Sequence, residues 1–247
     1  MIPVLAIVAS FVVLSAVVWR KKHQSDMRSL SMEQVADLMQ LQYTPNDSFG
    51  LIPQLQGFEL FERERSRWFG KGRISNVLRG WVGETQVCLF DYSYTVQAGK
   101  SSKKVTQTVF FANDKNWFLP NFHLKPERWW HKLQASLGIK SDINFEENPR
   151  FSNKFWLNGD FEALIRKQFT PELQGFLTEK PPAHLEGSNY YLIAYKPKES
   201  MNAADLQLFY QHCCEMVGLL QKKGDVTELL DLAEWKREAI KIPRSRG

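Results

Sequence analysis

The first nineteen residues, Met1 to Trp19, contain no charged side chain, and Arg20, Lys21 and Lys22 follow them directly. As an α-helix this segment would extend about 28 Å, close to the ~30 Å hydrocarbon core of a bilayer. Its apolar residues fall on all sides of the expected helix, whereas a helix that packs on a soluble domain carries a single apolar stripe. We therefore expect a transmembrane anchor over residues 1–19, with the lipid bilayer as a partner of this chain.

The order of apolar and basic residues indicates how the anchor is oriented. A cleaved signal peptide has its positive charge before the apolar stretch, and here the basic residues come after it. The positive-inside rule places Arg20, Lys21 and Lys22 on the cytoplasmic side as membrane-proximal basic residues. The expected location is the plasma (inner) membrane, with a single span, the N-terminus outside and the C-terminal domain in the cytoplasm.

The net charge of +5 is concentrated at the two ends of the chain. Arg20–Lys22 form one basic cluster, and the tail between Lys236 and Gly247 forms a second. Together these clusters exceed the charge of the whole chain, so the region between them is slightly acidic. A nucleic-acid-binding domain concentrates positive charge on its folded part, so we expect no nucleic-acid partner. The tail is either a solvated terminus or a contact with anionic headgroups, and both interpretations stay open.

The cysteines argue against a disulfide framework. Cys88, Cys213 and Cys214 are odd in number and lack metal-ligand spacing, which agrees with a reducing, cytoplasmic setting. In the triplet beginning at His212, neighbouring side chains would point about 100° apart on a helix and could not share one tetrahedral ion. We expect no metal and no cofactor.

The patterns after the anchor divide the chain into segments. Residues 20–56 are expected to form a juxtamembrane helix and a linker, because a capping-box pattern begins at Ser31 and Pro45 interrupts helical spacing. Residues 57–200 contain predicted strands first and helices later, which is typical of an α+β domain. Residues 201–241 are expected to be C-terminal helices packed on the same domain, and residues 242–247 a basic tail.

The fold class expected is α+β, with an N-terminal transmembrane helix followed by an antiparallel β-sheet domain packed with several helices. Period-two alternation in residues 85–96 predicts a strand with Cys88, Phe90 and Tyr92 on one face. Short connections to the neighbouring segments predict antiparallel pairing. Further strands are predicted at 73–81, 105–112, 155–157 and 190–196, and helices at 126–137, 160–169, 171–177, 202–223 and 225–241.

Established catalytic patterns are missing from the sequence, including the P-loop, the dinucleotide-binding glycine pattern, the zinc-protease helix and the nucleophile elbow. Asp91 with His123 or His131 could form an acid–base pair, although structural roles are favoured for all three. The alternative function is therefore a membrane-associated, hydrolase-like enzyme with an unrecognised site near Asp91 and His123. The sequence favours a protein that is not an enzyme.

Aromatic residues are unusually frequent between Trp117 and Trp130, with basic residues interleaved. Trp117, Phe122, Trp129 and Trp130 form a candidate interaction surface for a partner protein or the bilayer interface. The competing interpretation is a large aromatic core. Two adjacent tryptophans on a helix diverge by about 100°, so Trp129 and Trp130 are the best probes of an exposed face.

Several segments succeed one another in a fixed order: 90–94 (FDYSY), 107–109 (QTV), 118–127 (FLPNFHLKPE) and 151–159 (FSNKFWLNG). This series resembles an uncharacterised group of bacterial membrane-anchored proteins known only as a domain of unknown function. The resemblance covers roughly residues 70–200. It implies a bacterial, membrane-attached domain and carries no activity, cofactor or catalytic residue.

Taken together, the sequence predicts a membrane-tethered cytoplasmic interaction or scaffolding domain without evident catalysis. Its expected partners are the bilayer, through residues 1–19, and another membrane or cytoplasmic protein.

Overall fold

The computed structural model of this protein describes residues 2–48, 50–63, 72–98, 101–127, 142–182 and 184–220, except the side chains of residues 2–14, 17, 21, 63, 97 and 98. Eight strands in these ranges form one antiparallel sheet, and several helices pack on it, so the α+β prediction is confirmed. Among the side chains described, no helix offers a stretch long and apolar enough to cross a membrane. The side chains of residues 1–14, which form most of the predicted anchor, lie outside the described set.

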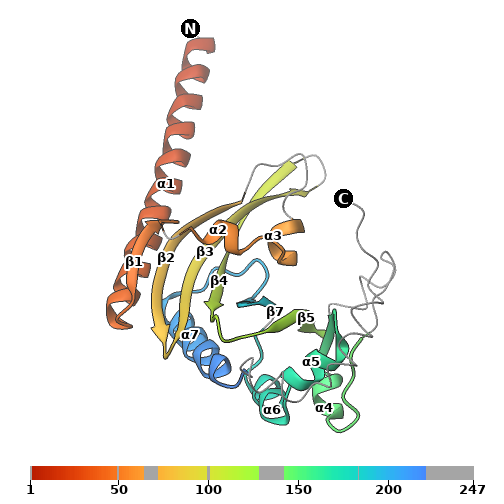
Figure 1. Ribbon diagram of the computed structural model, residues 1–247. Helices are drawn as coiled ribbons and strands as arrows, with labels where there is room; N and C mark the ends of the chain where they lie inside the picture. Colours follow the sequence, from red (N-terminus) through yellow and green to blue (C-terminus); the bar gives the residue numbers. More distant parts are fainter. Residues whose placement is uncertain are drawn as a thin grey trace.

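A single continuous helix, α1 (Ile2–Leu38, 37 residues), begins the fold. At 1.5 Å per residue it is about 55 Å long. The separate juxtamembrane helix predicted near Ser31 is instead the last part of α1, because no glycine or proline interrupts the chain between Pro3 and Pro45. The amino-terminal half of α1 projects away from the remainder of the molecule, while its carboxy-terminal half lies against the sheet (Figure 1).

The sheet has the strand order β1-β2-β3-β4-β8-β7-β5-β6 in the described residues. The strands are β1 (Gln42–Asn46), β2 (Arg73–Val82), β3 (Thr85–Ala98), β4 (Ser101–Asn113), β5 (Leu119–Pro126), β6 (Phe155–Gly159), β7 (His184–Asn189) and β8 (Tyr191–Tyr195). The predicted hairpin between β2 and β3 is confirmed, with Val82 opposite Thr85. The return of β4 along β3 is also confirmed, with Phe90 opposite Val109.

Each face of the sheet contributes to a separate apolar cluster. One face, called face A below, includes Val87, Leu89 and Phe110, and it packs against Met32 and Val35 of α1. The opposite face, face B, carries Cys88, Phe90, Tyr92, Val109 and Phe111 among others. Since successive side chains of a strand alternate between faces, the predicted alternation in β3 is confirmed.

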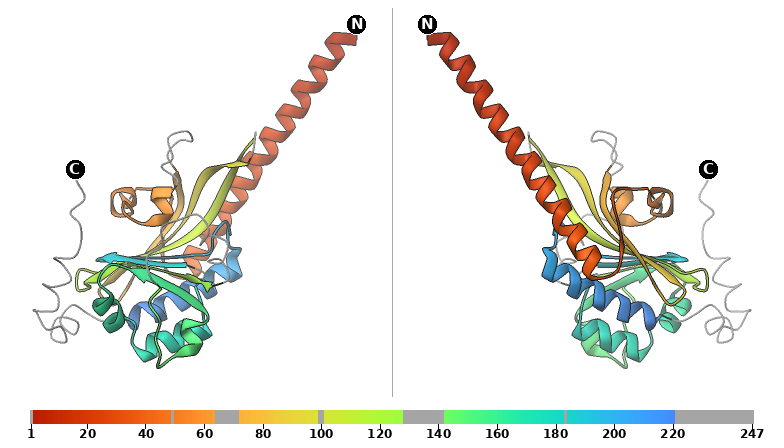
Figure 2. Two further views of the ribbon diagram at one scale, coloured as in Figure 1. Left: turned by 90° about the vertical axis from the view of Figure 1, so that its right-hand side faces the viewer. Right: turned by 90° about the vertical axis from the view of Figure 1, so that its left-hand side faces the viewer.

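The described helices cover the two faces unequally. Besides α1, face A carries α4 (Pro149–Ser152), α5 (Glu162–Gln168), α6 (Pro171–Glu179) and α7 (Ala203–Gly218). Face B carries the two short helices α2 (Leu51–Gln54) and α3 (Glu59–Arg63). Figure 2 shows α7, α6 and α4 on one side of the sheet and the α2–α3 segment on the other.

Two predicted elements differ from those observed. The segment expected as a linker contains β1, which pairs along β2 from Gln42 to Asn46. Pro45 is tolerated there because β1 is an edge strand, where a residue without a backbone N–H leaves no ladder bond unmade. The helix predicted from residue 126 does not begin there, because Pro126 ends β5 opposite Phe155. Residues 128–141 lie outside the described ranges, as do the final predicted helix and the basic tail.

Candidate functional site

Asp91 lies near the middle of β3 and is buried, with 1% of its surface exposed. Its position two residues after Leu89 places it on face A, beneath α1. Arg28 of α1 donates from Nε to Oδ2 at 3.0 Å and from Nη2 to Oδ1 at 2.9 Å. A bidentate guanidinium–carboxylate pair of this kind fixes orientation as well as distance. Asp91 therefore ties the first helix to the centre of the sheet.

The groups around this ion pair complete a polar network at the α1–sheet contact. Asn76 donates from Nδ2 to Asp91 Oδ2 at 3.0 Å, and Ser29 donates to Asn76 Oδ1 at 2.9 Å. Asn76 has φ of +52° and lies where the β2–β3 register shifts. Asparagine adopts this left-handed conformation more readily than most residues. The resulting bulge turns the Asn76 amide toward Asp91 and α1.

The carboxy-terminal part of the chain joins the same network. Arg28 also donates from Nη1 to the carbonyl oxygen of Met201, just before α7. The backbone N–H of Met201 in turn donates to the Thr108 hydroxyl at 3.0 Å. Three segments that are distant in sequence thus meet at Arg28, and the arrangement indicates a structural role for Asp91.

His123 lies on face B, because its neighbours Phe122 and Leu124 belong to the cluster on face A. Three strands, β4, β8 and β7, separate β3 from β5, which corresponds to about 19 Å at ~4.8 Å per strand. Asp91 and His123 are therefore on opposite faces and four strand positions apart. The hypothesis that they form one acid–base pair is wrong, and His131 lies outside the described residues.

His123 instead forms a polar cluster with groups from β7 and α3. Its Nδ1 contacts the carboxylate of Glu59, and its Nε2 lies 3.1 Å from His184 Nδ1. Nε2 is also 4.0 Å from Glu186 Oε1. Of these groups, His123, His184 and Glu186 are buried. We refer to Glu59, His123, His184 and Glu186 as the histidine cluster.

Glu186 serves as a remote cap for α3. Its Oε2 accepts the backbone N–H of Glu59 at 2.6 Å, and its Oε1 accepts that of Leu60 at 3.3 Å. The hydroxyl of Tyr195 donates to Oε1 at 2.7 Å. The first N–H groups of a helix have no partner within the helix, so a carboxylate from another element stabilises them. Glu186 thereby holds α3 against face B.

A pocket of about 170 Å³ opens beside the histidine cluster. Residues from three strands and from the segment before α3 form its wall, namely Gly57–Glu59, Asn121–His123, Asn158–Asp160 and Glu186–Ser188. Gly187 is required there, because a Cβ at this position would lie 2.3 Å from the Phe122 ring. Three carboxylates and one histidine in the wall make the pocket acidic, a character suited to a small cationic or hydroxylated molecule.

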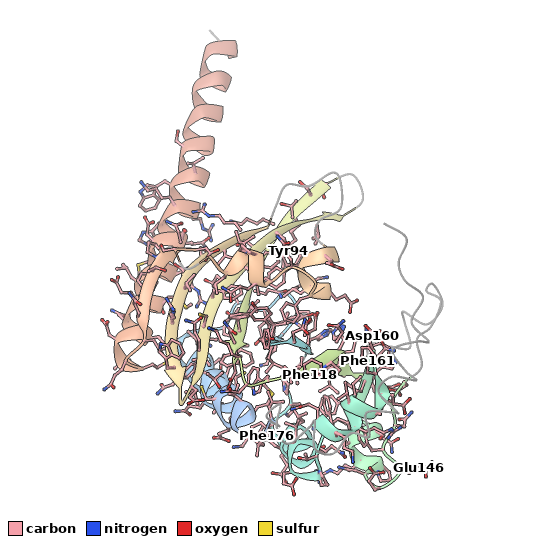
Figure 3. All side chains as sticks on the ribbon, in the orientation of Figure 1. Tyr94, Phe118, Glu146, Asp160, Phe161 and Phe176 are labelled. Atoms are coloured by element: carbon pink, nitrogen blue, oxygen red, sulfur yellow. The ribbon has the colours of Figure 1, made fainter. Side chains whose placement is uncertain are left out.

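The backbone next to the pocket is strained. Phe161 follows the pocket residue Asp160 and precedes α5 with φ of +63°. An aromatic residue in the left-handed region costs on the order of 1–3 kcal/mol. Figure 3 labels both residues, which directly precede α5 in the chain.

A buried cation lies on the same strands. Lys125 of β5 is buried on face B, and its Nζ is 4.2 Å from the centre of the Trp156 ring. Partial removal from water strengthens the attraction between an ammonium group and an indole face. Face B of β5, β6 and β7 is consequently polar and buried, in contrast to the apolar face B of β2, β3 and β4.

The candidate interaction surface is not supported where the structure describes it. Trp117 is 0% exposed and Phe122 is 4% exposed, and both belong to the cluster on face A. They are core residues, so their assignment to an exposed surface is wrong. Trp129 and Trp130 lie outside the described residues. Arg20 and Lys22 are exposed on α1, and the side chain of Lys21 is not described.

The cysteines have no reactive environment. Burial raises the pKa of the Cys88 thiol to about 12 and that of Cys214 to about 11. Cys213 is buried within the face A cluster, and desolvation raises the pKa of its thiol well above the ordinary value. Within the described ranges, no three histidine, cysteine or acidic side chains are placed to hold a metal ion.

Comparisons with known proteins give one distant likeness. No protein-family model matches the chain, and no curated protein matches it. The chain is similar to a crystal structure of the mycobacterial trehalose monomycolate transport factor A, with a TM-score of 0.47 and 10% sequence identity. The match covers 79% of this chain and 97% of that one. A likeness at this level carries no argument about function.

Proposed function

We propose that this protein is a membrane-tethered binding domain, held by a single span over residues 1–19 with its sheet on the cytoplasmic side. The observation that carries the proposal is the course of α1. Its uncharged amino-terminal sequence lies on the half that projects from the body, and the sequence becomes basic before α1 reaches the sheet (Figure 1). Residues 22–27 are all exposed, and contact with the body begins at Arg28.

The contact between α1 and the sheet supports this assignment. A flexible linker would suffice to hold a domain near a membrane, but here the bidentate Arg28–Asp91 pair fixes the helix on the sheet. Met32 and Val35 add buried apolar contact to the same helix. The arrangement fits a protein that must present its body at a defined height and orientation above the lipid.

A partner from the membrane fits the outward side of α1. Trp19, Met27 and Leu30 are exposed and share one side of the helix, because they are separated by eight and three residues. This stripe lies opposite the side that contacts the sheet. Polar residues 20–26 separate Trp19 from Met27 and Leu30, and this side of α1 faces away from the body just beyond the proposed span, so the occupant we propose is a helix of another membrane protein.

Membrane association is tested with the full chain expressed in bacterial cells. The unmodified chain is expected to stay with the membranes after high salt and alkaline carbonate and to be released by detergent. A Val8→Arg, Val12→Arg variant is expected in the soluble fraction, because each central arginine costs about 2.5–3.5 kcal/mol on insertion. The matched Val8→Ala, Val12→Ala variant should remain in the membrane. Release of the unmodified chain by salt or carbonate would contradict the tether.

Orientation and partner need separate measurements. A fluorescent-protein fusion at the carboxy terminus should fluoresce, whereas an alkaline phosphatase fusion there should be inactive.

Photo-crosslinking side chains at Met27 and Leu30 should give an adduct with a membrane protein, and the same group at Leu208, which is also exposed but lies on α7, should give none. An adduct of twice the chain's mass would show a second copy of this chain and overturn the proposed partner. Equal labelling from Leu208 would also overturn it.

A further inference from the structure

The β3–β4 hairpin continues beyond the rest of the sheet. On one side, β2 begins at Arg73 in the described part of the chain and pairs with β3 as far as Ser93. On the other side, β8 pairs with β4 only from Val109 onward. Among the residues described, the pairs from Tyr94–Val105 to Ala98–Ser101 therefore form a two-stranded extension, which we call the ribbon. Figure 3 places Tyr94 at the level of α2 and α3, where the ribbon leaves the sheet.

The end of the ribbon is basic and exposed. Ser101, Ser102, Lys103 and Lys104 are all exposed, and their neighbours across the strand include Val96 and no acidic residue. Lys103 and Lys104 point to opposite faces of the ribbon, so positive charge is present on both. An isolated two-stranded ribbon has little intrinsic stability in water, and a partner at its tip would hold it in place.

The ribbon and α1 project in the same direction. In Figure 1 the ribbon rises from the sheet on the side toward which the amino-terminal half of α1 points. Both views in Figure 2 agree, and in each the ribbon ends at about the middle of α1. The middle of α1 contains Trp19 and Arg20, at which the proposed span meets the cytoplasmic headgroups. The tip thus lies at the height of the lipid surface when α1 spans the bilayer.

We propose that the tip of the ribbon, through Lys103 and Lys104, contacts anionic lipid headgroups and forms a second membrane contact beside α1. This inference rests on the membrane tether proposed above. Basic residues near an anionic leaflet favour contact by about 1 kcal/mol each, or roughly fivefold. The serines and lysines suit the headgroup layer rather than the hydrocarbon. Two contacts on different elements would fix the rotation of the sheet about the axis of α1.

The test uses the full chain in phosphatidylcholine vesicles with and without phosphatidylglycerol. A fluorophore on Ser102→Cys should be quenched by lipids that carry a spin label on the headgroup when phosphatidylglycerol is present. Quenching should fall in neutral vesicles and in about 1 M salt, where the Debye length is about 3 Å. A fluorophore on Lys115→Cys, just beyond the opposite end of β4, should not be quenched.

Charge-reversal variants test the two lysines. Adding Lys103→Glu and Lys104→Glu to the labelled chain should lower the quenched fraction fivefold or more. The matched pair Lys115→Glu and Lys167→Glu makes the same change in net charge at exposed positions away from the tip and should leave quenching unchanged. Lysines on free strands also discourage pairing between molecules. If preventing such pairing were the only role of Lys103 and Lys104, the label on Ser102→Cys would show no quenching, or the same quenching with and without the two glutamate substitutions. Either result would overturn the inference.

A label on Val18→Cys separates this inference from the tether. Val18 is exposed near the proposed interface, and its label should be quenched whether or not the tip binds. Quenching at Val18→Cys without quenching at Ser102→Cys would overturn the tip contact and leave the tether intact. Failure of the chain to float with the vesicles would overturn both.

Discussion

Asp91 joins segments that are distant along the chain, since it receives Arg28 from 63 residues earlier. A buried carboxylate is costly unless donors surround it. Arg28, Asn76 and Thr108 supply those donors. Removing the Asp91 carboxylate leaves these buried donors without their acceptor. The free energy of unfolding should therefore respond strongly to changes at Asp91.

We expect Asp91→Asn to lower the free energy of unfolding of the full chain in detergent by about 2–4 kcal/mol, because Arg28 loses its counter-charge. The lower part of that range is favoured because the Arg28 side chain is 21% exposed. Denaturant titration followed by tryptophan fluorescence measures the change. As a control, Glu162→Gln removes the exposed pair with Arg166 and should cost about 0.5 kcal/mol or less. Equal losses in the two variants would contradict the role given to Asp91.

The cysteines give a prediction about pH. With a pKa of about 11, Cys214 is thiolate in only about one molecule in a thousand at pH 8, and alkylation requires the thiolate. Iodoacetamide at pH 8 should therefore label the native chain very slowly, with Cys88 and Cys213 unlabelled, as read by mass spectrometry. Labelling of Cys214 should increase as the pH rises toward 11, and all three should react in denaturant. Rapid labelling of Cys88 in the native chain would show that it is not buried.

At the scale of elements, the histidine cluster is explained by its position between a helix and the sheet. Leu60 and Phe61 of α3 pack on the apolar part of face B. Where α3 begins, the adjoining strands β5 and β7 are polar, and Glu186 holds that end through the backbone N–H groups of Glu59 and Leu60. The cluster thus secures the short helix that forms one side of the pocket.

Glu186→Gln is expected to loosen α3 without unfolding the sheet, because an amide caps a helix less strongly than a carboxylate and offers one acceptor oxygen in place of two. Hydrogen exchange at Glu59 and Leu60 should accelerate at least tenfold, while exchange in β3 and β4 stays unchanged. Glu199→Gln, which removes an exposed pair with Lys196, should alter neither region. Unchanged exchange at α3 in the Glu186 variant would show that other contacts hold the helix.

Strands and helices whose residues follow a local periodic pattern were predictable from the sequence. Which of these elements lie next to one another in the fold was not. Alternation in β3 identified Phe90 and Tyr92 as one face, and helical spacing identified α7 with Cys213 on its buried side. The pairing of β4 with β8 depends on contacts between segments distant in sequence. The same limit applies to the candidate site: Asp91 and His123 were recognisable as chemically capable residues, but their partners Arg28, Glu59 and Glu186 lie on other elements. A buried polar residue in a strand indicates that a polar partner exists, but the sequence does not show which residue that partner is.

At the scale of the whole molecule, α1 is a rigid helix that extends from the sheet to the projecting end of the molecule. Its docked half belongs to the core, and its projecting half carries the proposed membrane span. Because the two halves form one unbroken helix, the proposed span would fix the position of the sheet as well as hold it at the membrane.

A kink in α1 should separate these two consequences. Gln24→Pro removes a helical hydrogen bond in the exposed stretch between the proposed span and Arg28, and proline bends a helix there. We expect unchanged resistance to carbonate extraction and an unchanged unfolding midpoint, together with loss of headgroup quenching at a label on Ser102→Cys. Gln24→Ala should preserve the quenching. If the proline variant kept full quenching, the orientation of the body would not depend on a straight α1.

The closure of α1 onto Met201 also bears on how the protein is made. Arg28 and the Met201 carbonyl are separated by 173 positions, so this contact must wait until nearly all of the chain has left the ribosome. Met32 and Val35 are made before the strands that they cover, so their apolar side chains stay without their sheet partners until those strands have been synthesised.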